Sequence, residues 1–202
     1  MSDIKDELLP PQESGSESNT EHKAQLRNEA EARALFEQAK QRLLNVNEWE
    51  KYAGRGSASF QLTDATGKEV QRPAQQHDHF KIDIPGPGTV TGDGYDWAQI
   101  EYMEESRERN ADYLLMRVRP ATNPNGGGND VAHFFNDAAT SNFMVRREGN
   151  TITAAVYGRN ELPNMNAEKG IDKARNTMVA LSAMAGVSQI QWKSLVKGLL
   201  AE

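Results

Sequence analysis

Hydrophobic and polar residues alternate along several short segments in the middle of the chain. Along 97–103, for example, the pattern predicts that Ala98, Ile100 and Tyr102 share one face of a strand. A period of two residues is typical of a strand with one buried face. Turn formers such as Glu148-Gly-Asn150 separate these segments at hairpin distance, which indicates antiparallel pairing. We expect about six to seven strands, at Ser57–Thr63 paired with Glu69–Arg72, His79–Ile84, Trp97–Met103, Asp112–Arg119, Ser141–Arg147 and Thr151–Tyr157.

Three other segments repeat apolar residues at helical spacing. Residues 23–45 are rich in strong helix formers, and Trp49 and Tyr52 just beyond them are expected to fold back as aromatic plugs. Residues 167–185 carry an apolar stripe that Gly186 is placed to end. In the last segment, Ser188 and Gln191 fit a capping box before an apolar stripe. We predict an α+β fold, a mainly antiparallel sheet covered by one N-terminal and two C-terminal amphipathic helices.

The first 22 residues differ from the rest in composition. They combine turn formers with six acidic residues and one lysine, and so carry nearly all of the net charge of −6. Such a segment cannot bury enough apolar surface to offset its ordering entropy. We therefore expect residues 1–22 to be a disordered acidic leader, either a solubilising tail or a partner-binding arm, and residues 23–202 to be a single domain.

Charge and composition narrow the function classes. The body after the leader is nearly neutral, which argues against nucleic acid and against an anionic membrane surface as partners. The absence of cysteine excludes disulfides, thiolate metal sites and Cys nucleophiles. No signal peptide or membrane-spanning stretch is evident, so a cytoplasmic location is expected.

An antiparallel sheet with a final amphipathic helix resembles helix-grip domains, which bind lipids and other hydrophobic molecules, and cystatin-like domains, in which a sheet wraps a leading helix. The resemblance is one of fold, and such folds carry many functions. The order expected here, with one helix first and paired helices last, departs from the helix-grip pattern, which places its short helices after the first strand.

The most unusual loop is Pro85–Trp97, with four glycines and two prolines between two expected strands. Its spacing fits neither the dinucleotide fingerprint nor the Walker pattern, so a long connection at the rim of the sheet is the simpler interpretation. Rim loops often line pockets, which makes four of its residues candidate ligand contacts. These are Asp93, Tyr95, Asp96 and Trp97.

Histidine provides a second group of candidates. His77 and His79 stand two residues apart at a strand entrance, which is acceptable spacing for two metal ligands on one strand face. Such pairs also arise by chance, and a third ligand would have to come from elsewhere. His133 follows the glycine-rich loop 123–130, in a segment, 131–138, that the sequence assigns to neither helix nor strand. Phe134 and Phe135 beside it belong either to the core or to a lid over an apolar pocket.

The end of the last expected strand offers Arg159, Asn160 and Glu161 in succession before a proline. Arg159 could bind a carboxylate or phosphate with Glu161 orienting it, or the two could form an ordinary surface pair. Our main hypothesis is a non-catalytic module that binds an unknown small molecule or peptide between sheet and helices. The alternative is an interaction or assembly protein, and an enzyme using His133, Asp96, Arg159 and Glu161 is a third. The sequence identifies no cofactor.

Overall fold

The computed structural model describes residues 7–54, 58–84, 90–108, 110–126, 128–164 and 189–201. This part of the chain forms one seven-stranded antiparallel sheet, with the strands in the order β1-β7-β6-β5-β4-β3-β2. The strands are β1 (Ser16–Gln25), β2 (Ser59–Thr63), β3 (His79–Asp83), β4 (Asp96–Arg107), β5 (Ala111–Pro120), β6 (Thr140–Glu148) and β7 (Thr151–Glu161). The helices are α2 (Glu29–Leu44), the short η1 (Val46–Glu48), α3 (Trp49–Ala53) and η2 (Val90–Gly92), and a C-terminal helix over 189–199.

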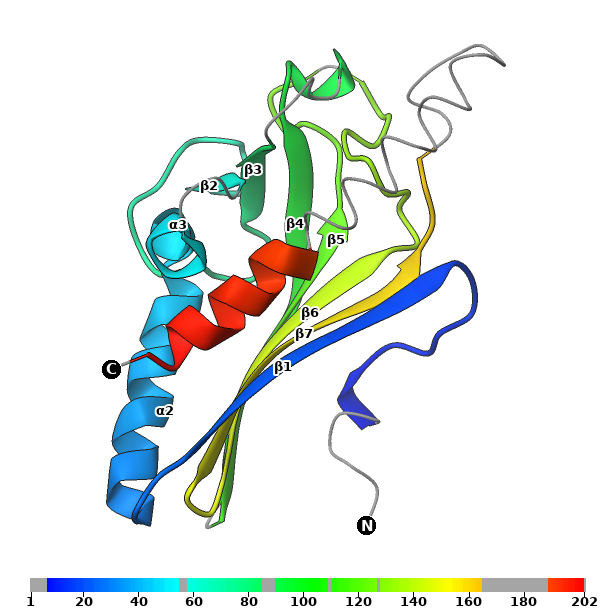
Figure 1. The fold of residues 1–202 in the computed structure, drawn as a ribbon. Coiled ribbons are helices and arrows are strands. Elements are labelled where there is room, and N and C mark those ends of the chain that lie inside the picture. The colour runs from blue at the N-terminus through cyan, green and yellow to red at the C-terminus, as the bar shows by residue number, and fades with distance from the viewer. Residues whose placement is uncertain are drawn as a thin grey trace.

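One face of the curved sheet is covered by α2, α3 and the C-terminal helix (Figure 1). We call it the inner face. Trp49, which is fully buried, lies at the centre of this core and packs its ring against Phe60, Phe80, Phe143 and Trp192. Its indole nitrogen donates to the carbonyl of Leu43 at 3.0 Å, which satisfies its one polar group. The predicted aromatic plug at the end of the first helix is therefore confirmed for Trp49.

The predicted α+β class with a mainly antiparallel sheet is confirmed. Alternation identified the inner face of β2 and β3, where Phe60, Leu62, Phe80 and Ile82 are buried. The tight turn expected at Glu148–Asn150 joins β6 to β7, with Gly149 at a φ of 57°. The C-terminal helix buries the predicted stripe of Leu195, Val196, Leu199 and Leu200. The helix predicted over 167–185, with Gly186 and Ser188, lies outside the described residues.

The start of the chain corrects the sequence analysis. Residues 16–22, expected to belong to a disordered leader, form most of β1, which pairs along its length with β7. β1 is an edge strand with mostly exposed or half-buried side chains, so its sequence shows no apolar alternation. Its order comes mainly from backbone hydrogen bonds to β7, which composition does not reveal.

The first long helix begins later than expected, at Glu29 instead of Lys23, because residues 16–25 belong to β1. Asn28 caps it, and its side-chain oxygen accepts a hydrogen bond from the backbone nitrogen of Glu31 at 2.9 Å. Ala32, Phe36, Ala39 and Leu43 then face the core at helical spacing. The apolar period of the helix was read correctly, whereas its boundary depended on a cap and a preceding strand.

Three further details differ from the expectations. A bulge between Ile100 and Tyr102 ends the alternation of β4, so Tyr102 is exposed instead of sharing a face with Ala98 and Ile100. The second arm predicted at 69–72 is reduced to one bridge between Thr63 and Glu69, and β2 pairs with β3 instead. Residues 131–138 are neither helix nor strand and form a loop with one bridge, from Phe135 to Pro163.

In the described residues the first strand is followed by two helices, as in the helix-grip pattern, then by six strands and the helix over 189–199. The expectation that a helix comes first was wrong because β1 had been assigned to the leader. The first of the two helices expected at the end of the chain lies outside the described residues. None of the helices in the described ranges is both long enough and apolar enough to cross a bilayer.

A second, smaller apolar cluster lies on the opposite, outer face of the sheet. It consists of Tyr113, Leu115, Met144, Ala155 and Tyr157, and Leu8 and Leu9 pack against it. The guanidinium of Arg117 donates to the carbonyl of Leu8 at 2.6 Å. The N-terminal segment 7–15 therefore crosses the outer face, on the side of the sheet away from the helices (Figure 1).

Candidate functional site

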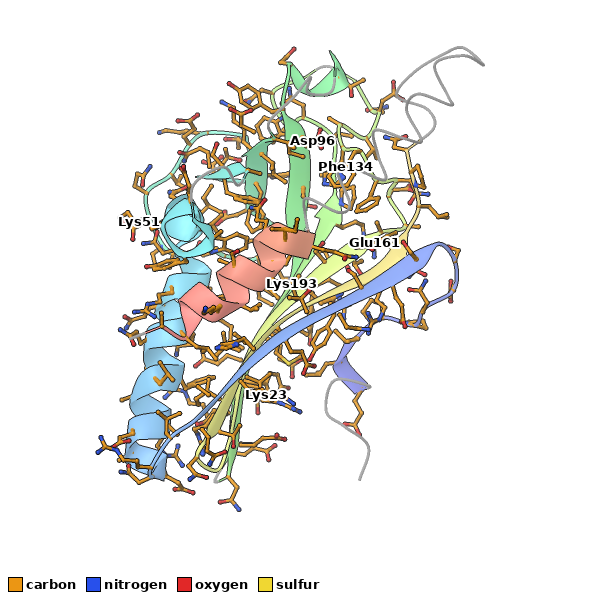
Figure 2. The ribbon with its side chains drawn as sticks, viewed as in Figure 1. Lys23, Lys51, Asp96, Phe134, Glu161 and Lys193 are labelled. Atoms are coloured by element: carbon orange, nitrogen blue, oxygen red, sulfur yellow. The ribbon has the colours of Figure 1, made fainter. Side chains whose placement is uncertain are left out.

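A pocket lies between the inner face of the sheet and the beginning of the C-terminal helix. Its cavity volume of about 70 Å³ is several times the roughly 10–15 Å³ needed for one water molecule. Figure 2 shows Glu161 at the end of β7 and Phe134 in the loop before β6, and both residues line the pocket. Most of the wall is apolar: Ala58, Phe60, Phe80, Ile82, Ile84, Ala98, Val118, Pro120, Phe134, Phe135, Ala139, Phe143 and Trp192. The polar lining residues are Ser18, Arg119, His133, Thr140, Ser141, Glu161, Gln189 and Gln191.

The β3–β4 connection, the β5–β6 connection and the segment after β7 meet at the end of the sheet that carries the pocket. The backbone nitrogen of Trp97, at the start of β4, donates to the carbonyl of Ala132 at 2.6 Å. The backbone nitrogen of Asn164 donates to the carbonyl of Phe134 at 2.8 Å, which ties the segment after β7 to the same loop. The loop containing His133 is therefore held on both sides by backbone hydrogen bonds, and its position does not depend on apolar packing alone.

His133 presents a neutral imidazole to the pocket. Its Nδ1 accepts a hydrogen bond from the backbone nitrogen of Phe135 at 3.0 Å, which places the proton on Nε2. Its ring stacks on that of Phe134, with 4.4 Å between centroids. Burial lowers the pKa of His133 to about 3, because the charged form would lose its hydration, while the hydrogen bond from Phe135 acts weakly in the other direction. His133 is therefore an uncharged hydrogen-bond donor at neutral pH.

Glu161 enters the pocket because β7 is bulged. The register between β1 and β7 shifts between Ser16 and Ser18, and Asn160 adopts a left-handed φ of 55°. In regular alternation Glu161 would share the outer face with Arg159. A bulge re-aims the side chains that follow it, and here it directs Glu161 to the inner face. Burial raises the pKa of Glu161 above its ordinary value, while the Ser18 hydrogen bond and the charge of Arg159 act to lower it.

The carboxyl group of Glu161 lies over Gly158, where no side chain fills the inner face of β7. A Cβ at Gly158 would collide with Oε1 of Glu161 and with Oγ of Ser18. Ser18 Oγ donates to the same Oε1 at 3.1 Å. Ser18 and Ser141 are the cross-strand neighbours of Gly158 on β1 and β6, so the polar end of the pocket spans three adjacent strands.

The C-terminal helix closes the pocket from the other side. Gln191 is buried, and its side chain contacts both the backbone nitrogen of Ala58 at 3.1 Å and the carbonyl of Ala58 at 3.5 Å. Ser188, the other residue of the predicted capping box, lies outside the described residues. The observed role of Gln191 is to join the helix to the start of β2, next to Trp192 in the pocket wall.

The candidate residues of the loop 85–97 are not among the residues that line the pocket. Asp96 accepts a hydrogen bond from the backbone nitrogen of Phe134 at 3.4 Å, and Trp97 is buried with its indole nitrogen donating to Gly92. Asp93 accepts from the side chain of Asn123 at 3.1 Å. Tyr95 lies under the ammonium group of Lys81, 4.3 Å from its ring centroid. Residues 85–89 lie outside the described part of the chain.

Arg159 faces β1, and Asn160 faces the N-terminal segment. Arg159 donates to the carbonyls of Ser18 and Gly158 and to the side chain of Asn19, and Glu161 is not among the residues to which it donates. Asn160 accepts hydrogen bonds from the backbone nitrogens of Glu13 and Ser14 and donates to the carbonyl of Pro11. The N-terminal segment therefore holds the bulge that aims Glu161.

The two candidate metal ligands lie in different environments. His77 is exposed and precedes β3 with a φ of 76°, whereas His79 is buried on the outer face. Within the described ranges, no three His, Asp or Glu side chains gather in a way that would hold a metal ion. Nδ1 of His79 has no hydrogen-bond partner there, and it borders a shallow hollow of about 330 Å³ that Gln99 and Arg119 also line. No Phe, Tyr or Trp is among the described residues that line this hollow, so the inner pocket is the stronger candidate.

Of the eight candidate residues, the structure brings His133 and Glu161 together in the pocket. Phe134 and Phe135, left open as lid or core, form part of its wall. Sequence analysis missed Ser18, Ser141 and Gly158. Ser18 stood in the segment assigned to disorder, and no local pattern shows that positions 18, 141 and 158 are neighbours on adjacent strands.

Comparisons with known proteins place the chain by its fold. No family model matches it, and neither does any curated protein. A hypothetical protein from Helicobacter pylori, known from a crystal structure, is 14% identical with a TM-score of 0.50, over 91% of this chain and 87% of that one. The likeness is one of fold. Norcoclaurine synthase from Thalictrum flavum is 7% identical with a TM-score of 0.35, over 93% of this chain and 99% of that one. A major latex-like protein from Panax ginseng is 9% identical with a TM-score of 0.34, over 87% and 99%.

Proposed function

We propose that this protein is a non-catalytic module that binds a small molecule with a largely apolar body in the pocket between sheet and C-terminal helix. The observation that carries the proposal is the wall of that pocket. Five phenylalanines and Trp192 surround it, and its few polar groups gather around Glu161 and His133. Concave, mostly apolar sites with a small number of placed polar groups are the usual form of small-molecule sites in proteins.

The geometry favours binding over the enzyme hypothesis. That hypothesis required His133, Asp96, Arg159 and Glu161 to line one cleft, and among them His133 and Glu161 line the pocket. Asp96 holds the loop from behind, while Arg159 lies on the outer face. His133 also makes a poor general base at neutral pH, because burial holds its pKa at about 3.

The test uses N-phenyl-1-naphthylamine, an uncharged apolar dye whose fluorescence rises out of water. We expect saturable binding to the full chain, and a thermal shift that grows with dye concentration. A ligand present at a hundred times its dissociation constant adds about 2.7 kcal/mol to the free energy of unfolding.

A pocket-filling variant locates the binding. Ser141→Phe places a ring on β6 inside the pocket and should abolish dye binding. Ser59→Phe adds the same ring to an exposed position of β2 and is the matched control. Dye binding that Ser141→Phe leaves unchanged, in a folded variant, would refute the proposed site. Loss of binding in both variants would point to general destabilisation, which the melting temperature of each variant would reveal.

A further inference from the structure

Three ionisable side chains line the described part of the pocket: Arg119, His133 and Glu161. Arg119 is already paired. Its Nε and Nη2 donate to the carboxylate of Glu101 at 2.5 and 3.1 Å, and its Nη1 donates to the carbonyl of Asp137 at 2.6 Å. His133 is neutral, as its hydrogen bond from Phe135 indicates. The net charge that the described wall of the pocket offers to a ligand is therefore that of Glu161.

Among the described residues, the carboxylate of Glu161 has few hydrogen-bond partners for a half-buried charge. The hydroxyl groups of Ser18 and Ser16 act on this carboxylate, and Ser18 Oγ donates to Oε1. Arg159 reaches the group only through its electric field, because its guanidinium donates to Ser18, Asn19 and Gly158. A buried charge is costly unless it is paired and hydrogen-bonded. The bulge at Asn160 and the open space over Gly158 hold this carboxylate against the pocket and away from bulk water.

The remaining wall suits a positive charge on an apolar body. Aromatic ring faces attract ammonium groups, and the rings of Phe134, Phe135 and Trp192 line the same pocket as Glu161. Lys193 on the C-terminal helix is exposed and does not line the pocket, so it does not supply the missing counter-charge (Figure 2).

We infer that the ligand is an apolar amine whose ammonium group pairs with Glu161 while its hydrocarbon or aromatic body fills the pocket. This inference rests on the proposed binding function and adds the chemical class of the ligand. A carboxylate ligand would meet the negative charge of Glu161. A neutral ligand would cover the carboxylate without supplying a positive charge to compensate it. An amine supplies a charge-assisted hydrogen bond at the place where the protein leaves one open.

The experiment compares three molecules with one skeleton: 2-phenylethylamine, 2-phenylethanol and phenylacetate. The dissociation constant of each molecule is measured by its competition with the dye for the full chain at pH 7.5, and is checked by isothermal titration calorimetry. We expect the amine to bind about tenfold or more tightly than the alcohol, and phenylacetate to bind most weakly. In Glu161→Gln, which keeps the shape of the side chain, the amine should lose about tenfold in affinity and the alcohol should change less than threefold.

Glu148→Gln is the matched control, because it makes the same substitution at an exposed residue of β6 that does not line the pocket. It should retain the preference for the amine. An alcohol that binds as tightly as the amine to the wild type would overturn the inference, and so would an amine affinity that Glu161→Gln leaves unchanged. The wild-type series decides alone if the variant does not fold. If Ser141→Phe blocks dye binding but the wild type shows no preference for the amine, the inference is wrong and the proposed function stands. If the dye does not bind at all, the proposed function itself is wrong.

Discussion

Gly158 and Glu161 share one space: the carboxyl group of Glu161 lies where a Cβ of residue 158 would project. The neighbouring Ser18 hydroxyl occupies the rest of that space. The inner face of β7 therefore changes character along the strand, from the core residues Ile152, Ala154 and Val156 to a gap filled by an acid from three residues further on. A glycine in a strand interior often marks such a close approach.

The variant Gly158→Ala tests this relationship. The added methyl group must displace the carboxylate of Glu161, so we expect a loss of about 1–3 kcal/mol in the free energy of unfolding, as for other overpacked sites. The affinity for 2-phenylethylamine should fall as well. Gly128→Ala is the control, since a Cβ at Gly128 meets no atom within 4 Å. Urea unfolding of both variants provides the comparison, and equal stabilities would contradict the shared space.

His133 predicts how stability depends on pH. The pKa of about 3 in the folded protein lies below the ordinary histidine pKa of 6.5, so the unfolded chain binds more protons between those values. The contribution of His133 to stability is therefore complete above about pH 6.5 and is lost as the pH falls towards 3. At about 1.4 kcal/mol per pKa unit, the loss reaches several kcal/mol.

Other acidic groups also affect stability in that range, so the informative quantity is the difference between the wild type and His133→Asn. Denaturant unfolding at several pH values should give a shallower acid loss for the variant. Parallel profiles for the two proteins would show that His133 is not buried as a neutral ring.

Alternation predicted much of the fold, because a period of two residues shows directly which face of a strand is buried. Phe60, Leu62, Phe80 and Ile82 were assigned to the buried face from local pattern alone, and the structure places them there. β1 could not be found in this way. Its polar residues are ordered by pairing with β7, more than a hundred residues away, and missing it led to the expectation that a helix comes first.

The residues of the candidate site likewise fall into those that local sequence could predict and those that depend on pairing between distant strands. His133 was a candidate because it follows a glycine-rich loop and stands beside two phenylalanines. Glu161 was a candidate as the residue that would orient Arg159, and it lines the pocket without receiving a hydrogen bond from Arg159. Ser18 and Gly158 are ordinary residues whose importance comes from their register across two strands. Glu161 itself faces the pocket only because Asn160 breaks the alternation, and bulges of this kind are set by tertiary contacts such as those with Glu13 and Ser14.

Asn160 should therefore control the N-terminal segment. In Asn160→Gly the left-handed backbone remains accessible while the side-chain hydrogen bonds to Pro11, Glu13 and Ser14 are lost. We expect faster amide hydrogen exchange at Glu13 and Ser14 in this variant. Asn160→Ala should show the same faster exchange and a further loss of stability of roughly 1–2 kcal/mol, because a Cβ disfavours this backbone conformation. Unchanged exchange at both amides in Asn160→Gly would show that the side chain does not hold the segment.

A buried ion pair lies on the inner face at the other end of the sheet. Arg147 is fully buried, and its Nε donates to Oδ2 of Asp112 at 2.5 Å while its Nη1 donates to the carbonyl of Gly149. The exposed end of the cluster is Arg33 of α2, 3.3 Å from the same carboxylate oxygen. Oδ1 of Asp112 and Nη2 of Arg147 have no hydrogen-bond partner within the described part of the chain.

Because each buried charge compensates the other, the effects of removing them should not add. Arg147→Met leaves the carboxylate of Asp112 buried with the half-exposed Arg33 as its remaining ion-pair partner, and we expect a loss of about 3–5 kcal/mol in the free energy of unfolding. The double variant Arg147→Met/Asp112→Leu removes both charges and should recover most of that loss, since well-packed apolar residues often replace a buried pair at little cost. A double-mutant cycle by urea unfolding measures the coupling. If the two single losses simply add in the double variant, Asp112 and Arg147 do not compensate each other and the pair is not the unit that the geometry indicates.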